Sequence, residues 1–106
     1  MKDVEVVQII QNYIQTHYKD DNFNANCVCS KVGYSRRQVD RLFKKHLNKT
    51  LQEYITAVRL TEGANELLNT KKSILEVALN SHYETHEGFS RSFHKRFHII
   101  PSAYRE

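Results

Sequence analysis

The amino-acid sequence predicts an all-α fold, and three observations lead to that prediction. Glycine and proline are scarce, with three and one among 106 residues, whereas a turn-rich β protein needs more of both. Apolar residues recur at steps of three and four residues, which is the period of an amphipathic helix. Three capping-box patterns mark helix starts, and no segment has the alternation of a strand. At 40% hydrophobic and 26% charged residues, the composition is that of an ordinary globular domain.

The first expected helix covers about residues 3–18. Val4, Val7, Ile10 and Ile14 recur there at three- and four-residue steps, so one face should be apolar. The stretch KDDNFNAN follows, and its turn-favouring residues should end the helix.

A short helix and a longer one are expected next, separated by a tight turn. The short helix covers about residues 25–32, with Val28 and Cys29 inward, and Gly33 can adopt the positive φ of the turn. Ser35 with Gln38 forms the capping box of the longer helix. The apolar face of this longer helix should consist of Val39, Leu42, Phe43 and Leu47. Asn48 should end the helix in a left-handed conformation.

A long helix of about residues 51–69 should follow the capping box Thr50–Glu53. A third capping box, Ser73–Glu76, opens a short helix that reaches about residue 80. The core candidates of the long helix are Leu51, Tyr54, Ile55, Val58, Ala64 and Leu68.

The last expected helix covers about residues 85–97, where Phe89, Phe93 and Phe97 stand four residues apart. Pro101 then starts a short final turn.

The arrangement of short helix, tight turn and longer helix occurs twice. Val28 and Cys29 correspond to Val77 and Ala78, and one extra residue then enters the second turn. After it, the matching pairs are Ser35 and Thr85, Val39 and Phe89, Arg41 and Arg91, Phe43 and Phe93, Lys45 and Lys95, and Tyr54 and Tyr104. Each copy has the features of a helix-turn-helix, whose second helix enters the major groove of DNA.

The charge distribution agrees with an anionic partner. The net charge is +4, and residues 31–50 hold seven Lys or Arg against a single acid, Asp40. Residues 91–105 hold four more basic residues and no acid. Two separate basic patches are therefore expected, one on each copy of the repeat.

The chain resembles the DNA-binding domain of the AraC/XylS family of bacterial transcription regulators. The resemblance is carried by GYSRRQVDRLFKKHLNKTLQEYITAVRL in the first half and ILEVALNSHYETHEGFSRSFHKRFHIIPSAYR in the second. It implies seven helices in one AraC-type domain, with a first lobe at about 3–50, a linker helix at 51–69 and a second lobe at 73–106. It also implies sequence-specific DNA binding that activates transcription, usually through contacts with RNA polymerase.

The same resemblance implies which residues meet double-stranded DNA. The base-reading candidates are Arg37, Asp40 and Arg41 in the first recognition helix, and His86, Glu87, Ser90 and Arg91 in the second. The phosphate candidates are Ser35, Arg36, Lys44, Lys45, Thr85, Lys95 and Arg96, because cations and helix N-termini bind phosphate. Alternatively, Asp40 could form a purely intramolecular ion pair, or it could orient Arg37 or Arg41. Arg37 and Arg41 could contact phosphate or only solvent, and Arg91 could touch phosphate or brace its lobe by pairing with an acid.

Three positions depart from the family pattern. The family usually has glycine where His82, Asn48 and His98 stand. Asn and His are the non-glycine residues that tolerate positive φ best, so these changes affect local turns more than the fold.

Two functions other than DNA binding would also suit features of the sequence. His82 with His86, His94 with His98, and Cys27 with Cys29 could suit a metal-responsive sensor, but the first pair straddles a predicted turn. A helical protein-interaction module is the other alternative. No nucleophile motif or phosphate-binding glycine loop is present, so no enzyme activity, catalytic residue, metal site or cofactor is expected.

No signal peptide or long apolar run is visible, so no membrane association is expected and a cytoplasmic, nucleoid-associated protein fits best. Two neighbouring cysteines make no disulfide framework, which agrees with a reducing compartment. An effector or dimerisation domain could lie outside this chain, which could be a fragment of a longer regulator.

Overall fold

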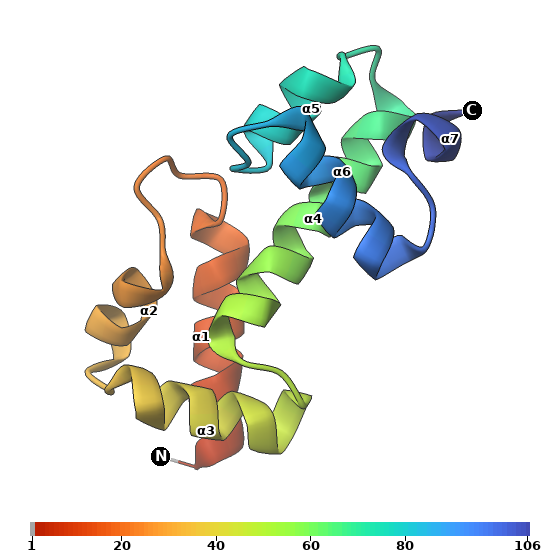
Figure 1. Ribbon diagram of the computed structural model, residues 1–106. Helices are drawn as coiled ribbons and strands as arrows, with labels where there is room; N and C mark the ends of the chain where they lie inside the picture. Colours follow the sequence, from red (N-terminus) through yellow and green to blue (C-terminus); the bar gives the residue numbers. More distant parts are fainter. Residues whose placement is uncertain (1) are drawn as a thin grey trace. The chain divides into compact units, whose positions relative to one another are not determined.

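A computed structural model describes residues 2–106, and this part of the chain contains helices and no strand (Figure 1). The helices are α1 Asp3–His17, α2 Ala25–Val32, α3 Arg36–Leu47, α4 Leu51–Asn69, α5 Ile74–Asn80, α6 His86–Phe97 and α7 Pro101–Arg105. The predicted all-α fold with seven helices is therefore confirmed over residues 2–106. The chain forms two compact units, and α4 crosses the boundary between Thr56 and Ala57.

The predicted capping boxes begin α3, α4 and α5. At α3, the backbone N–H of Gln38 donates to Ser35 Oγ over 3.1 Å, and Ser35 N–H donates to Gln38 Oε1 over 2.8 Å. Thr50 with Glu53 and Ser73 with Glu76 make the same reciprocal pairs. These bonds satisfy N–H groups that have no partner inside a helix, so they fix where each helix starts.

The first unit packs three helices and the start of α4 around one core, and α3 crosses α1 in Figure 1. The residues of its core are Val6, Val7, Ile10, Ile14, Phe23, Ala25, Val28, Val39, Leu42, Phe43, Leu51 and Ile55. Val4, expected on the apolar face of α1, is instead 57% exposed, and Val6 is buried in its place. The buried stripe begins at Val6, two residues later, because Val4 lies next to the N-terminal end of the helix.

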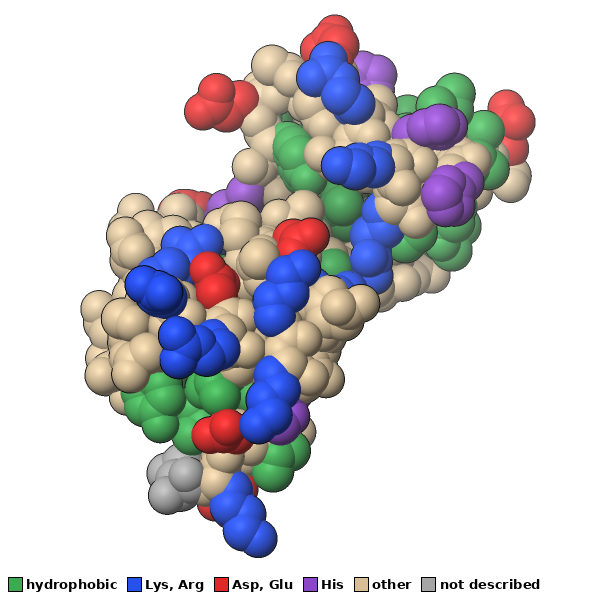
Figure 2. Space-filling view, turned by 60° about the horizontal axis from the view of Figure 1, so that its bottom comes forward, with side chains coloured by type: hydrophobic (Ala, Val, Ile, Leu, Met, Phe, Trp, Pro, Cys, Tyr) green, Lys and Arg blue, Asp and Glu red, His purple; other side chains and the backbone are tan. Residues whose placement is uncertain are grey.

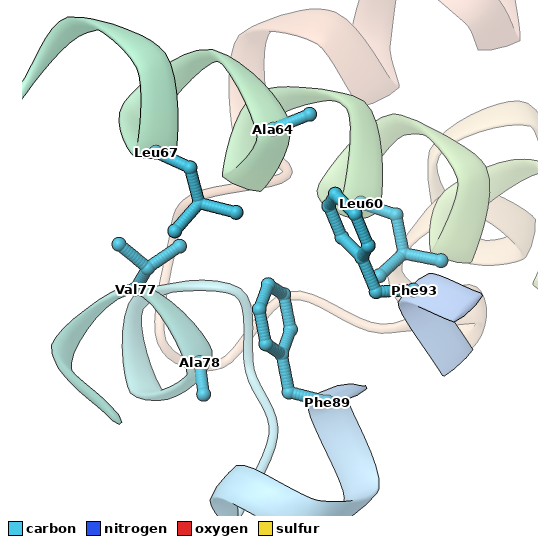
Figure 3. Packing of buried hydrophobic residues seen from close by; sticks show 7 residues of the cluster. All are labelled: Leu60, Ala64, Leu67, Val77, Ala78, Phe89 and Phe93. Carbon is cyan, nitrogen blue, oxygen red and sulfur yellow. The ribbon is translucent and has the colours of Figure 1, made fainter. Parts of the chain in front are cut away.

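The second unit is built around the phenylalanines of α6. Figure 3 shows Phe89 and Phe93 directed toward α4, with Val77 and Ala78 of α5 beside Phe89. Both rings are fully buried. Its core cluster consists of Leu60, Ala64, Leu67, Val77, Ala78, Phe89 and Phe93.

One core candidate of α4 was wrong. Leu68 is 56% exposed, whereas Leu67 is buried at 1% exposure. Leu60, Ala64 and Leu67 lie at four- and three-residue steps on one face, and Leu68 is turned about 100° away from Leu67. Other expected core residues are only half-buried: Cys29, Leu47, Tyr54, Val58 and Phe97.

The internal repeat is confirmed by matching aromatic contacts. Phe43 meets Tyr54 edge-on with ring centroids 5.5 Å apart, and Phe93 meets Tyr104 edge-on at 5.4 Å. In both units the longer helix is thereby held to the helix that follows it.

The three positions where the family has glycine all have positive φ. The angles are 57° at Asn48, 68° at His82 and 63° at His98, close to 72° at Gly33. Asn48 and His98 terminate α3 and α6 with the same bond, from their N–H to the carbonyl four residues earlier. The substitutions therefore keep the left-handed turns that glycine would adopt.

Gly63 and Arg105 stabilise the second unit, and the sequence did not single out these roles. A Cβ at Gly63 would lie 2.8 Å from the Oγ of Ser81 and 3.3 Å from the Phe89 ring, so a larger residue would require both side chains to move. The Arg105 guanidinium donates to the carbonyls of Leu67 and Thr70, at the C-terminal end of α4. Those carbonyls lack partners within the helix, and a cation suits the negative end of the helix dipole.

Replacing Phe93 by alanine should remove the centre of the second unit's core. Phe93→Ala is expected to lower the free energy of unfolding by about 3–5 kcal/mol, because it leaves a cavity under α4. Denaturant unfolding followed by circular dichroism measures this loss. Leu68→Ala, at an exposed position, should change stability little, and equal stabilities for the two variants would contradict this packing.

Replacing His98 by glycine should stabilise the protein. A β-carbon is disfavoured at φ 63°, so His98→Gly is expected to raise the free energy of unfolding by about 0.5–1 kcal/mol. The matched control is His94→Gly inside α6, which should lower the free energy of unfolding by about 1 kcal/mol. Thermal unfolding of both variants tests the pair, and destabilisation by His98→Gly would argue against the left-handed turn.

Candidate nucleic-acid interface

The outer face of α3 carries a stripe of cations. Its inner face is anchored by Val39 and Phe43, and Arg37, Arg41 and Lys44 lie on the opposite side at four- and three-residue steps. All three cations are exposed. Figure 2 shows several Lys and Arg side chains gathered on one face of the first unit. This stripe can present guanidinium and ammonium groups to an anionic surface.

Arg37 and Arg41 are not engaged elsewhere in the described chain. Within residues 2–106 neither side chain forms a hydrogen bond or a salt bridge. An arginine fixed by an acid would lose donors needed for a ligand, so these two side chains keep all five N–H donors.

Asp40 faces the protein rather than the two arginines of the stripe. Its Oδ1 accepts a hydrogen bond of 2.9 Å from the backbone N–H of Leu51, the first residue of α4. Its Oδ2 lies 3.5 Å from Nε of Arg36. The alternative of an intramolecular ion pair is therefore confirmed, and the partner is Arg36, one turn earlier on the same helix. The alternative in which Asp40 orients Arg37 or Arg41 is wrong.

The lysines near the end of α3 lie close to acids of the first unit. Lys44 Nζ is 3.8 Å from Glu53 Oε1, and Lys45 Nζ is 3.7 Å from Asp3 Oδ2. Both lysine side chains are more than half exposed, so these pairs contribute little stability and compete weakly with phosphate.

The pKa of Glu53 is lowered, chiefly by the hydrogen bond from the backbone of Thr50.

The outer face of α6 is more mixed. Glu87, Arg91 and His94 are exposed and occupy the positions that Arg37, Arg41 and Lys44 hold in α3. Arg91 forms no ion pair among residues 2–106, so bracing of the lobe by Arg91 is not supported. His94 was not among the predicted site residues, although it matches Lys44 at the repeat offset of 50 residues.

The other predicted contacts of α6 lie at its start and along its sides. The Oγ1 of Thr85 accepts from the backbone N–H of Gly88 over 3.0 Å and so caps the helix. His86 is the first residue of α6 and is exposed, whereas Ser90 is half-buried. Lys95 and Arg96 are exposed in its last turns, as is Arg36 in the first turn of α3.

The residues considered for a metal do not converge. Of the pair His82 and His86, His82 lies in the turn at φ 68° and only His86 lies on α6, as the sequence indicated. Among the described residues, no group of three His, Cys, Asp or Glu side chains is placed to hold a metal ion. Cys27 and Cys29 are free thiols, and burial raises the pKa of Cys29, which disfavours its thiolate.

None of the helices in residues 2–106 combines the length and apolar character needed to span a bilayer.

Known proteins share both the sequence pattern and this fold. A family model described as a helix-turn-helix domain matches residues 28–106. The regulatory protein SoxS of Salmonella typhimurium is 34% identical over 105 residues, which cover 99% of this chain and 97% of SoxS. The Tn10 TetD protein of Escherichia coli is 43% identical over 89 residues, which cover 84% of this chain and 64% of that protein.

A solved structure extends the similarity to the backbone. The structure of a transcriptional regulator with an AraC-type DNA-binding domain from Chromobacterium violaceum superposes with a TM-score of 0.80 at 27% identity, covering 96% of this chain and 87% of that one. SoxS and the Chromobacterium violaceum protein are both described as regulators. The chain therefore belongs to the AraC-type helix-turn-helix family of DNA-binding transcription regulators.

Proposed function

We propose that the protein binds a specific DNA sequence by inserting α3 and α6 into successive major-groove segments, and that it activates transcription. The observation that carries this proposal is the exposed stripe of Arg37, Arg41 and Lys44 on α3, opposite a fully buried face. The major groove admits an α-helix and distinguishes all four base pairs, so a helix exposed in this way suits direct reading of bases.

Base reading is assigned to the exposed arginines first. Arginine binds O6 and N7 of guanine with two parallel hydrogen bonds, and Arg37, Arg41 and Arg91 have their donors available. Around Arg91, we assign base contacts to His86, Glu87 and Ser90. Glu87 is a suitable acceptor for the N4 amino group of cytosine, which accounts for an acid on a helix that meets a polyanion.

Phosphate contacts are assigned to cations and caps at the margins of the two helices. Such contacts fix the register of the protein on the duplex and carry no sequence information. The hydroxyls of Ser35 and Thr85 accept from the helix backbone and can still donate their own hydrogen to phosphate. The proposed phosphate-binding residues are Ser35, Arg36, Lys44, Lys45, Thr85, Lys95 and Arg96.

RNA polymerase is the proposed protein partner, as the family resemblance implies for an activator. We also propose that the protein acts in the bacterial cytoplasm on the nucleoid, because its ligand is chromosomal DNA. The full length of SoxS is nearly covered by this chain, whereas TetD extends beyond it. An effector or dimerisation domain is therefore proposed only for a longer form of this protein.

Removing one arginine should separate base reading from phosphate binding. Arg37→Ala or Arg41→Ala is expected to weaken binding to a duplex selected from a random pool by about 1–3 kcal/mol, because a bidentate contact to guanine is lost. Fluorescence anisotropy with selected and scrambled duplexes measures the difference. Lys71→Ala, at an exposed position outside α3 and α6, is the control. An equal loss on both duplexes would reduce the arginine to a phosphate contact.

Salt dependence should report the phosphate contacts. The logarithm of the binding constant is expected to fall linearly with the logarithm of the salt concentration, with a slope of about −0.9 per neutralised phosphate. The double variant Lys44→Ala/Lys45→Ala should make the slope shallower by about 1.8, since two cations are removed. Binding that does not respond to salt would favour a protein-interaction module over a DNA-binding protein.

A further inference from the structure

We propose that Asp40 is a positioning residue that ties the recognition helix α3 to the start of α4, and that it does not share the base-reading role proposed for Ser90, its counterpart in α6. This inference rests on the proposed function and deepens it. It assigns different roles to Asp40 and Ser90, two base-reading candidates that occupy the same position of the repeat.

The contacts of Asp40 are those of a helix cap. Leu51 is the first residue of α4 and is fully buried, so its backbone N–H cannot turn to water. The first N–H groups of a helix have no intrahelical acceptor, and Asp40 Oδ1 supplies one at 2.9 Å. The carboxylate also places a negative charge at the positive end of the α4 dipole, while Arg36 lies 3.5 Å from its second oxygen.

The second copy of the repeat removes the need for this cap. The residue that matches Leu51, at an offset of 50 residues, is Pro101, and it too is buried and begins a helix. Proline has no backbone N–H, so no acceptor is required there. The residue that matches Asp40 is Ser90, whose hydroxyl forms no hydrogen bond within residues 2–106. The first copy of the repeat therefore has an aspartate where the next helix begins with a backbone N–H. The second copy has a serine where the next helix begins with proline, which has no N–H.

A positioning role and simple electrostatics predict opposite changes in DNA affinity when Asp40 is removed. Asp40 is a negative charge on the helix that meets DNA, so its removal alone would strengthen binding to every duplex. If Asp40 instead holds α3 in place, its removal weakens binding to every duplex, because the contacts of Arg37 and Arg41 lose their geometry. If Asp40 reads a base, its removal changes the preference at one base pair.

The experiment measures binding of Asp40→Ala and Asp40→Asn to a duplex selected by the wild-type protein and to variants with each base pair replaced. Asp40→Ala is expected to bind all of them about two- to tenfold more weakly, with the base preference kept, as the loss of one such hydrogen bond allows. Asp40→Asn should lose less, because its amide oxygen still accepts from Leu51. Asp21→Ala removes the same charge from an exposed position between α1 and α2 and should not weaken binding.

A second measurement observes the hydrogen bond without DNA. Amide hydrogen exchange at Leu51, followed by NMR, should accelerate about tenfold or more in Asp40→Ala and much less in Asp40→Asn. Unchanged exchange at Leu51, tighter binding by Asp40→Ala, or a changed preference at a single base pair would each overturn the positioning role. If the wild-type protein selects no duplex, the proposed function fails, and the exchange result still tests the cap.

Ser90 is tested on the same set of duplexes. Ser90→Ala is expected to weaken binding to the selected duplex by about two- to tenfold and to change the preference at one base pair, because a contact to DNA is lost. A uniform loss on all duplexes, or no loss, would overturn the assignment of Ser90 to the bases. Thermal unfolding of each variant verifies that the loss does not come from unfolding.

Discussion

Each unit depends on a contact between a phenylalanine of its recognition helix and a tyrosine of the following helix. Phe43 with Tyr54 and Phe93 with Tyr104 meet edge-on at nearly the same distance. Both phenylalanines are fully buried, so the residues on the opposite face of each helix point away from the core, and they are exposed. The cations of α3 are presented to solvent for this reason, so the proposed function follows from how the core fixes the rotation of the helix.

The next constraint is where the backbone must turn. Asn48, His82 and His98 adopt positive φ where glycine would be easier, and each position ends a helix or forms the turn before α6. Short polar side chains and histidine accept this region at a modest cost. The turns keep their geometry in spite of the changed residues, and so α3 and α6 keep the lengths that the repeat requires.

Most of the fold could be predicted from local patterns. The capping boxes located the starts of α3, α4 and α5, and the repeat located the aromatic anchors. Leu68 could not be placed from periodicity, because Leu67 and Leu68 fit an apolar face about equally well until the crossing with α6 is known. The contact of Asp40 with Leu51 was also hidden, since the two residues are eleven apart and belong to different helices. The residue types in the sequence indicated the candidates for DNA contact. Only the three-dimensional contacts distinguished Asp40, which caps α4, from the exposed Arg37 and Arg41.

The two recognition helices share a scaffold and differ in what it presents. The stripe of α3 is entirely cationic, whereas the matching stripe of α6 holds Glu87, Arg91 and His94. Under the proposed function, α3 therefore supplies more of the salt-dependent affinity, and α6 relies more on matched donors and acceptors at the bases. Pro101 contributes to this difference, because it frees position 90 from capping a helix. One missing N–H group in the backbone thus adds a polar side chain to the surface proposed to meet DNA.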